Sequence, residues 1–173
     1  MVNLPRAARL GEAFFSEDGV YRYTLTRDPD LVRRELPSIL WIMLNPSTAD
    51  AQKDDPTIRR CRAFAGAWGY GRVEICNIFA LRSTDPNQLY RAVDPIGPDN
   101  DFHIAAAVGR AGGHVVAAWG THAKLGDRDR AVMMLLRGLG VRPVCLGVNQ
   151  DGTPRHPLYV ASSTFPALYE GRR

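Results

Sequence analysis

The sequence lacks the features that mark disulfide-bonded, metal-binding and membrane-spanning proteins. Its three cysteines, Cys61, Cys76 and Cys145, are isolated in apolar segments, without the paired Cys or His spacing of zinc and iron–sulfur sites. We therefore expect reduced core cysteines and no metal or other cofactor. No apolar run approaches the roughly 20 residues that cross a bilayer, and the N-terminus has no charged start followed by an apolar signal segment. These absences predict a cytoplasmic protein with no membrane partner.

Lysine is also scarce. Lys53 and Lys124 are the only lysines among 22 basic residues, and the formal net charge is +4. The planar guanidinium of arginine suits phosphate contacts, so the arginine bias is compatible with a nucleic-acid or nucleotide partner, although GC-rich coding would produce it too. Arg59, Arg60 and Arg62 lie on or beside the face opposite the apolar side of a predicted helix, pointing toward solvent or toward a phosphate backbone.

Sequence motifs for common cofactors and nucleophiles are missing as well. The chain contains no GxGxxG after a strand, no GxxxxGK[ST] and no GxSxG. We therefore do not expect the phosphate-binding loops that hold NAD or a nucleoside triphosphate.

The most informative segment that is present is the apolar run of residues 39–44, which ends abruptly in the polar segment 45–50. An apolar run without alternation is typical of a strand that is covered on both faces. In open α/β sheets, ligands bind beyond the carboxyl ends of such strands. We therefore expect Asn45 at the point where the sheet opens.

Four apolar strands alternate with helices along the chain. The strands are expected at residues 39–44, 73–81, 114–119 and 144–148, and the helices from Asp55-Pro56 to Gly69, through Ile104 and Val108, and through Val132 and Leu139. This order predicts an α/β fold, a three-layer α/β/α sandwich with a four-stranded parallel sheet. Residues 13–16 and 21–25 predict an N-terminal β-hairpin. We expect a single domain, residues 1–173, with residues 1–36 as the hairpin extension and 37–173 as the core.

Polar residues follow each of the four strands, and parallel strands end on the same side of a sheet, so these residues are predicted to meet at one edge. They are Asn45, Ser47, Thr48 and Asp50 after the first strand, Asn77 within the second, Thr121, His122 and Lys124 after the third, and Arg155 and His156 after the fourth. Asn77 interrupts an apolar strand and must find partners or forfeit about 1–3 kcal/mol. It is therefore either a loop anchor or a ligand contact.

Each of these residues also has a purely structural interpretation. The segment 45–48 can form only a turn, His156 can cap the helix that follows it, and His122 and Lys124 can be surface residues. Only their joint arrangement favours a functional site.

Five segments carry a resemblance to a known family. They are Leu44–Asp50 (LNPSTAD), Asp54–Thr57 (DDPT), Asn77–Leu81 (NIFAL), Pro95–Asp101 (PIGPDND) and Pro154–Leu158 (PRHPL). Together they resemble the bacterial domain-of-unknown-function family numbered 1643, over nearly the whole chain. The resemblance implies no particular activity.

The same order of motifs is more distantly similar to the uracil-DNA glycosylase superfamily, with an Asn-Pro motif after a strand, a second strand ending in Asn, a Trp-Gly turn at Trp119 with Lys124 nearby, and a final His-Pro motif. This resemblance implies metal-independent hydrolysis of an N-glycosidic bond on a base extruded from a nucleic acid. It also implies that Asn45 places or activates the attacking water, that Asn77 reads the edge of the base, and that His156 stabilises the departing base.

The implied chemistry suits these residue types, because the cleavage develops positive charge on the sugar and negative charge on the base. Asn is a poor general base, so Asp50 is a candidate for that role. Leu158 or Tyr159 is a candidate wedge that enters the base stack. The remaining predicted substrate contacts are Ser47, Thr48, Trp119, Lys124 and Arg155.

Two other functions stay open on the sequence. The same pocket can belong to a non-catalytic module that binds nucleic acid or a modified nucleotide, or to a small-molecule hydrolase that uses Asp50 and His156. Leu158 stands where the glycosylase superfamily commonly has Ser, which removes a hydroxyl expected to contact phosphate.

Overall fold

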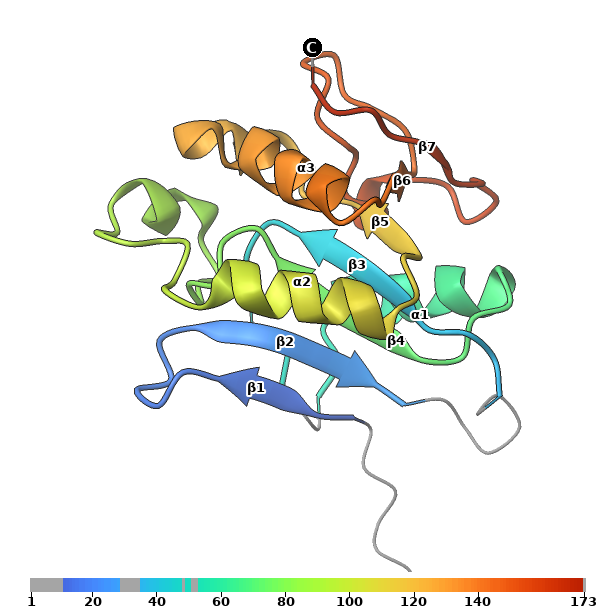
Figure 1. Cartoon of the computed structure of the whole chain (residues 1–173), viewed down its shortest axis with the longest axis horizontal. Helices are drawn as coiled ribbons and strands as arrows, with labels where there is room; N and C mark the ends of the chain where they lie inside the picture. The colour runs from blue at the N-terminus through green and yellow to red at the C-terminus, as the bar shows by residue number, and fades with distance from the viewer. Residues whose placement is uncertain (1–10, 29–34, 48, 51–52, 173) are drawn as a thin grey trace, which may run out of the picture.

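The computed structural model describes residues 11–28, 35–47, 49–50 and 53–172. Within them the chain forms one seven-stranded sheet, in the order β1-β2-β4-β3-β5-β6-β7, and three α-helices (Figure 1). The strands are β1 (Ala13–Phe15), β2 (Arg22–Arg27), β3 (Ile39–Met43), β4 (Val73–Asn77), β5 (Val115–Ala117), β6 (Val144–Cys145) and β7 (Ala167–Leu168), and the helices are α1 (Pro56–Ala67), α2 (Asn100–Arg110) and α3 (Arg128–Gly138). The predicted α/β class is confirmed.

The sheet is mixed in direction and larger than predicted. β3 pairs in parallel with β4 and with β5, and β5 pairs in parallel with β6. The pairs β1–β2, β2–β4 and β6–β7 are antiparallel. The prediction of a four-stranded sheet missed β7, because a strand of two residues has no detectable periodicity, and it left β2 outside the sheet.

The N-terminal hairpin is confirmed, but it is not an extension beside the core. β1 and β2 pair with each other, and β2 also pairs with β4, with Leu25 opposite Ile75. This pairing occupies the edge of β4 that would otherwise present unpaired amides and carbonyls. Residues 22–27 therefore belong to the same sheet as the predicted core.

Side chains of the central strand β3 alternate between two apolar layers. Leu40 and Ile42 pack in the cluster that contains α2 and α3, whereas Trp41 and Met43 pack in the cluster that contains α1. Figure 1 shows α2 and α3 on the near side of the sheet and α1 on the far side. Because helices cover both faces, the strand carries an unbroken apolar sequence, as predicted.

Helix α1 begins as the sequence predicts. The side chain of Asp55 accepts a hydrogen bond from the Ile58 amide at 2.8 Å, and Pro56 occupies the first turn, where a missing amide proton costs nothing. Cys61 packs on the buried face of α1, and Cys76 and Cys145 are also buried and free, as predicted. None of the described helices is both long and apolar enough to cross a membrane.

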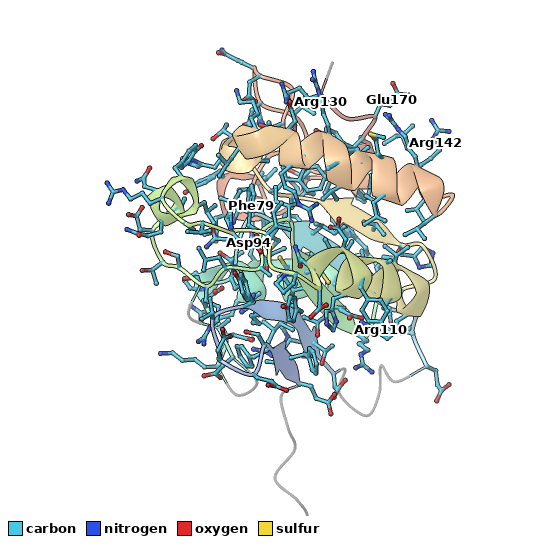
Figure 2. All side chains as sticks on the ribbon, turned by 60° about the vertical axis from the view of Figure 1, so that its left-hand side comes forward. Phe79, Asp94, Arg110, Arg130, Arg142 and Glu170 are labelled. Atoms are coloured by element: carbon cyan, nitrogen blue, oxygen red, sulfur yellow. The ribbon has the colours of Figure 1, made fainter. Side chains whose placement is uncertain are left out.

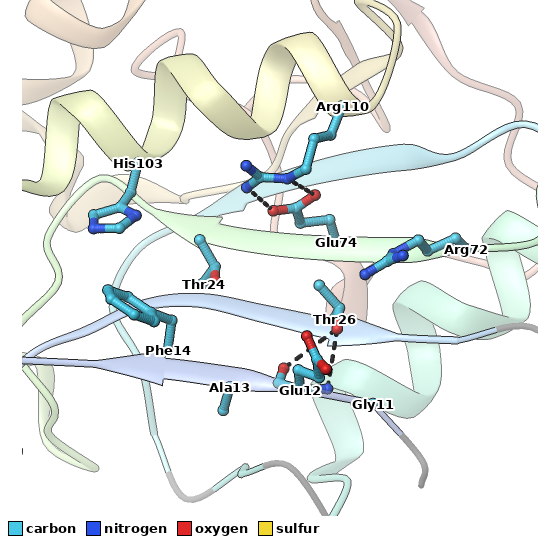
Figure 3. Close-up of a pocket in the computed structure, with 10 residues that line it drawn as sticks. All are labelled: Gly11, Glu12, Ala13, Phe14, Thr24, Thr26, Arg72, Glu74, His103 and Arg110. Atoms are coloured by element: carbon cyan, nitrogen blue, oxygen red, sulfur yellow. Dashed lines mark hydrogen bonds and ion pairs between the residues drawn. The ribbon is translucent and has the colours of Figure 1, made fainter. Parts of the chain in front are cut away.

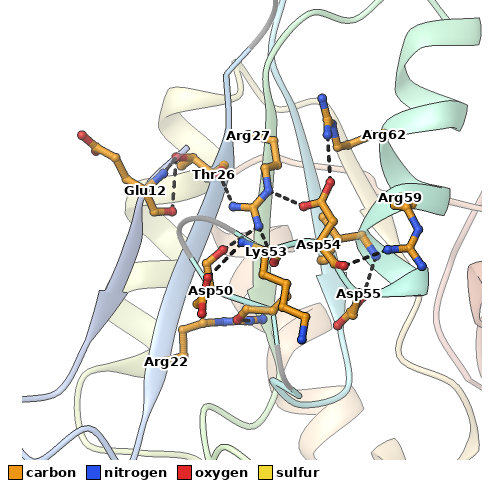
Figure 4. A network of polar contacts seen from close by, with 12 residues as sticks. Glu12, Arg22, Thr26, Arg27, Asp50, Lys53, Asp54, Asp55, Arg59 and Arg62 are labelled. Atoms are coloured by element: carbon orange, nitrogen blue, oxygen red, sulfur yellow. Dashed lines mark hydrogen bonds and ion pairs between the residues drawn. The ribbon is translucent and has the colours of Figure 1, made fainter. Parts of the chain in front are cut away.

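Two of the three arginines of α1, Arg59 and Arg62, are exposed to solvent, and all three also contact the protein itself. Arg60 donates to the main-chain oxygens of Pro157 and Val160 and so ties α1 to the segment after β6. Arg59 donates to the main-chain oxygen of Asp54 at 2.8 Å, and Arg62 pairs with the carboxylate of Asp54 at 2.8 Å (Figure 4). The two alternatives predicted for these side chains left out such internal contacts.

Asn100 anchors the end of β4. This fully buried side chain donates through Nδ2 to the main-chain oxygens of Asn77 (2.9 Å) and Ile78 (3.1 Å). Asp99, its neighbour, is exposed and forms no side-chain capping bond. Of these two residues at the start of α2, Asn100 therefore anchors the end of β4, whereas the Asp99 side chain makes no comparable contact with the described residues.

We expect Asn100→Ala to lower the free energy of unfolding by about 2 kcal/mol, because it leaves a buried carbonyl oxygen without its donor. Urea denaturation followed by circular dichroism measures this change. As the control, Asp99→Ala should stay within about 0.5 kcal/mol of the wild type. Equal losses in the two variants would show that the anchor contributes nothing specific.

Candidate functional site

A cavity of about 410 Å³ lies at the carboxyl ends of the parallel strands. Its walls come from the segments that follow β3, β5 and β6, from the last residue of β4, from β2, from the start of α1 and from residues 83–86. Its polar and aromatic lining residues are Arg22, Asn45, Ser47, Asp55, Thr57, Asn77, Ser83, Thr84, Trp119, Thr121, His122, His156 and Tyr159. Several distant segments of the chain thus contribute to one concave surface.

Five of the ten residues proposed from the sequence line this cavity: Asn45, Ser47, Asn77, Trp119 and His156. Thr121 and His122, from the same set of strand exits, line it too. Asp50, Lys124, Arg155 and Leu158 are not among the lining residues, and Thr48 lies outside the described residues.

The side chains that are absent from the lining are used elsewhere. Lys124 pairs with Asp151 at 2.9 Å, and Arg155 donates to the main-chain oxygen of Val148 at 3.2 Å. Asp50 receives the Lys53 amide on its carboxylate at 2.9 Å. These side chains interact with neighbouring loop residues, which strand order alone does not predict.

Asn45 presents an acceptor to the cavity. Its Nδ2 donates to the main-chain oxygens of Ser83 (2.8 Å) and Pro46 (3.2 Å). Both amide protons are therefore engaged, and the side-chain oxygen is the group left for a ligand or a water molecule. The turn interpretation and the ligand interpretation of Asn45 are compatible, because different atoms serve each.

Asn77 presents a donor, because Arg22 fixes the orientation of its amide. Arg22 Nη2 donates to Asn77 Oδ1 at 3.3 Å, and a guanidinium can only donate, so the oxygen must face Arg22. Asn77 Nδ2 has no acceptor among the described residues and lies in the wall of the cavity. The oxygen of Asn77 also takes part in loop anchoring, the other role predicted for this residue, because Arg22 donates both to it and to the main-chain oxygen of Ala49 at 2.7 Å.

His156 presents a second donor. Its Nδ1 accepts from the amide of Leu158 at 3.4 Å, at the start of the short 3₁₀ segment Pro157–Tyr159. Burial lowers the pKa of His156, against the opposing effect of the negative charge of Asp55. This shift favours the neutral imidazole, and because Nδ1 accepts the Leu158 amide, the proton of the neutral form lies on Nε2, which can donate to a ligand.

Several lining residues were missed as site residues from the sequence, and the charged ones among them are Arg22 and Asp55. Arg22 is 2% exposed and comes from β2, which the sequence assigned to a separate hairpin. Asp55 was recognised only as a helix cap. The sequence feature that could have identified Asp55 is its position at the start of α1, because a helix that begins after a strand exit directs its first turn toward the ligand site.

A second cavity, of about 630 Å³, lies over β1 and β2 beside α2 (Figure 3). Glu74, which is buried, pairs with Arg110 through two contacts of 2.5 and 3.2 Å. The negative charge of Glu74, the buried charge in the wall of this larger cavity, is therefore neutralised by Arg110. In the described part of the chain, no three His, Cys, Asp or Glu side chains gather into a group that could hold a metal ion.

The Asp151–Lys124 pair gives a testable pH dependence. A hydrogen bond from Thr153, followed by that from Lys124, lowers the pKa of Asp151 to about 2. Because the folded-state pKa lies below the unfolded value of about 4, the carboxylate stabilises the fold above about pH 4, and this contribution is lost as the pH falls through 2. We expect Asp151→Asn to lower the free energy of unfolding by about 1 kcal/mol at pH 7.

Urea titrations of both proteins at pH 7 and at successively lower pH measure the difference, which should shrink as the carboxylate of the wild type is protonated. Glu170→Gln is the control, because the Glu170 side chain is 73% exposed and its ion pair with Arg142 is long, at 3.7 Å. We expect this variant to change the free energy of unfolding by no more than about 0.5 kcal/mol. A difference for Asp151→Asn that does not vary with pH would contradict this assignment.

The comparisons with known proteins identify a family but no activity. The model of the family described as "Protein of unknown function (DUF1643)" matches residues 22–158, from the first residue of β2 to the 3₁₀ segment after His156. Comparison with curated proteins and comparison with solved structures gave no match. The matched region contains every described residue of the cavity except Tyr159, and it makes up most of the chain. The chain therefore belongs to the family "Protein of unknown function (DUF1643)".

Proposed function

We propose that the cavity at the strand ends binds a nucleobase and that its residues hydrolyse the N-glycosidic bond of that base, in DNA or in a modified nucleoside. One observation carries the proposal: Asn45, Asn77 and His156, which are far apart in the sequence, line the same cavity. The distant similarity of their motifs to uracil-DNA glycosylases supports the choice of reaction. The cavity volume of about 410 Å³ lies within the range of about 300–1,000 Å³ that is usual for small-molecule sites.

The hydrogen-bonding groups that these three side chains leave unused suit the needs of the reaction. Cleavage leaves positive charge on the sugar and negative charge on the base. The oxygen of Asn45 accepts a hydrogen bond from the attacking water and orients it, while Nε2 of the neutral His156 donates a hydrogen bond to an oxygen of the departing base. The hydroxyl of the water joins the sugar as the glycosidic bond breaks, and the proton of the water ends on the released base. Nδ2 of Asn77 donates to a further carbonyl oxygen of the base.

Asp55 replaces Asp50 as the carboxylate in this proposal. Asp50 was the expected general base, but it does not line the cavity, whereas Asp55 does. One oxygen of Asp55 caps α1 through the Ile58 amide. Its negative charge faces the cavity and stabilises the positive charge that develops on the sugar.

The rim of the cavity supplies candidates for contacts with a nucleic-acid strand. Tyr159 lines the cavity and is 82% exposed, and Leu158 beside it is 42% exposed. Either side chain can fill the gap in the base stack that an extruded base leaves. Lys124 and Arg155, which are exposed outside the cavity, are the candidates for phosphate contacts.

A second candidate function is binding of a modified nucleotide without cleavage. Asp55 favours it, because its Oδ1 already caps a helix and is thus less available as a base. In that case the same donors and acceptor would serve recognition alone.

Base release gives the direct test. We expect the protein to release an altered base from single-stranded or duplex oligonucleotides that carry uracil or other modified bases, or from free modified nucleosides. Asn45→Ala and His156→Ala should each slow the release about 100-fold or more, because each removes a group that acts on the transition state. Abasic sites are detected by alkaline cleavage of the oligonucleotide and free bases by chromatography.

Arg142→Ala is the control, since Arg142 is 72% exposed and lies beside α3, away from the cavity lining (Figure 2). Its activity should equal that of the wild type. Full activity of an Asn45→Ala/His156→Ala double variant would exclude the proposed mechanism. Steeply salt-dependent DNA binding without base release would favour the binding function.

A further inference from the structure

Among the described residues, three arginine side chains are almost fully buried: Arg22, Arg27 and Arg128 are 2%, 1% and 4% exposed. Arg27 pairs with Asp54 at 2.5 Å, and Arg128 pairs with Asp101. Arg22 has no carboxylate within ion-pair distance in the described part of the chain, although it lies on the same strand as Arg27 (Figure 4). It is also the one of the three that lines the cavity at the strand ends.

The contacts of Arg22 leave its charge without a counter-ion. Its Nη1 donates to the main-chain oxygen of Ala49 at 2.7 Å and its Nη2 to Asn77 Oδ1 at 3.3 Å, and both acceptors are neutral. Its Nε is buried and has no partner among the residues that the structure describes. Burial lowers the pKa of Arg22 to about 10, so the guanidinium still carries its charge at pH 7.

The surrounding charges only partly compensate for Arg22. Asp55 lines the same cavity and favours the charged form of Arg22, but it is outside ion-pair distance, and the positive charges of Arg82 and Arg27 act in the opposite direction. A second lining residue, Trp119, also has a buried donor, its indole Nε1, for which the described part of the chain provides no acceptor. An uncompensated cation in the cavity wall, with two buried donors nearby that lack partners among the described residues, favours a ligand that brings negative charge.

We propose that Arg22 is the counter-ion for an anionic oxygen of the ligand, so that the cavity selects ligands that carry an ionised oxygen. Two sources of that oxygen are chemically equivalent for a guanidinium: the ionised carbonyl of an acidic nucleobase and the phosphate of a nucleotide. The first source rests on the proposed function, in which negative charge develops on the base. The second does not require any cleavage.

Binding of matched small molecules tests the assignment by isothermal titration calorimetry at pH 7. The probes are barbituric acid, which is an ionised pyrimidine, uracil, which is neutral, uridine 5′-monophosphate and inorganic phosphate. We expect at least one ionised probe to bind more tightly than uracil. Arg22→Gln should weaken binding of that probe about tenfold or more, because a hydrogen-bonded charge pair is lost. Arg22→Lys should keep the preference for the ionised probe at lower affinity.

Arg82→Gln is the matched control, since it removes the same charge near Arg22 from an exposed side chain outside the cavity lining. Binding by this variant should stay within about twofold of the wild type, as expected for an exposed charge. If Arg22→Gln does not fold, the wild type alone decides: its affinity for 5-nitrouracil should follow the ionised fraction of that compound as the pH rises through the compound's own pKa.

Tighter binding of barbituric acid would identify the base as the source of the anion, and tighter binding of uridine 5′-monophosphate and phosphate would identify the phosphate. If uracil binds as well as every ionised probe, or if folded Arg22→Gln binds the ionised probe as well as the wild type, the assignment is overturned. Arg22-dependent anion binding without base release from any substrate would overturn the proposed hydrolysis and leave the anion site standing. Base release without any preference for ionised probes would overturn the anion site and leave the proposed hydrolysis standing.

Discussion

The structure depends on the burial of β3 between two layers of helices. The strand pairs on both edges, with β4 and with β5, and its side chains alternate between the cluster under α2 and α3 and the cluster under α1. Because neighbouring strands pair with both edges of β3 and helices cover both faces, only the residues just beyond the end of the strand can reach a surface cavity. That end is where Asn45 and the cavity lie.

Polar contacts then hold the loops around the cavity in place. Arg60 joins α1 to the segment that carries His156, and Asn100 holds the end of β4 at Asn77. Arg27 donates to Asp54 and to the main-chain oxygens of Asp50 and Lys53, and so fixes the segment before α1 (Figure 4). Several segments that carry lining residues are therefore held by side chains that do not line the cavity, and Arg22, which does line it, orients Asn77.

The electrostatics of the cavity differ from those of the rest of the core. Elsewhere, buried charges such as Arg27, Arg128 and Glu74 have partners of opposite sign. In the cavity wall, the acceptors that Arg22 has among the described residues are neutral, and burial lowers the pKa of His156. An uncompensated buried charge costs stability, and binding of the proposed anionic ligand would offset that cost.

The sequence by itself determined the local elements and the family. The hairpin, the buried strand β3, the capped start of α1, the free buried cysteines and the family membership all follow from short-range patterns, because periodicity and capping act over a few residues. The order of the strand exits also gave reason to group Asn45, Asn77 and His156.

Only the tertiary structure decided the rest. It placed β2 against β4 and thereby brought Arg22 into the cavity wall. It also showed that Lys124 and Asp50 interact with neighbouring loop residues outside the cavity lining. It also put Asp55 in the cavity in place of Asp50. The physical reason is that the burial and pairing of a charged side chain depend on which distant strand or loop lies next to it, and the periodicity of the sequence does not contain that information.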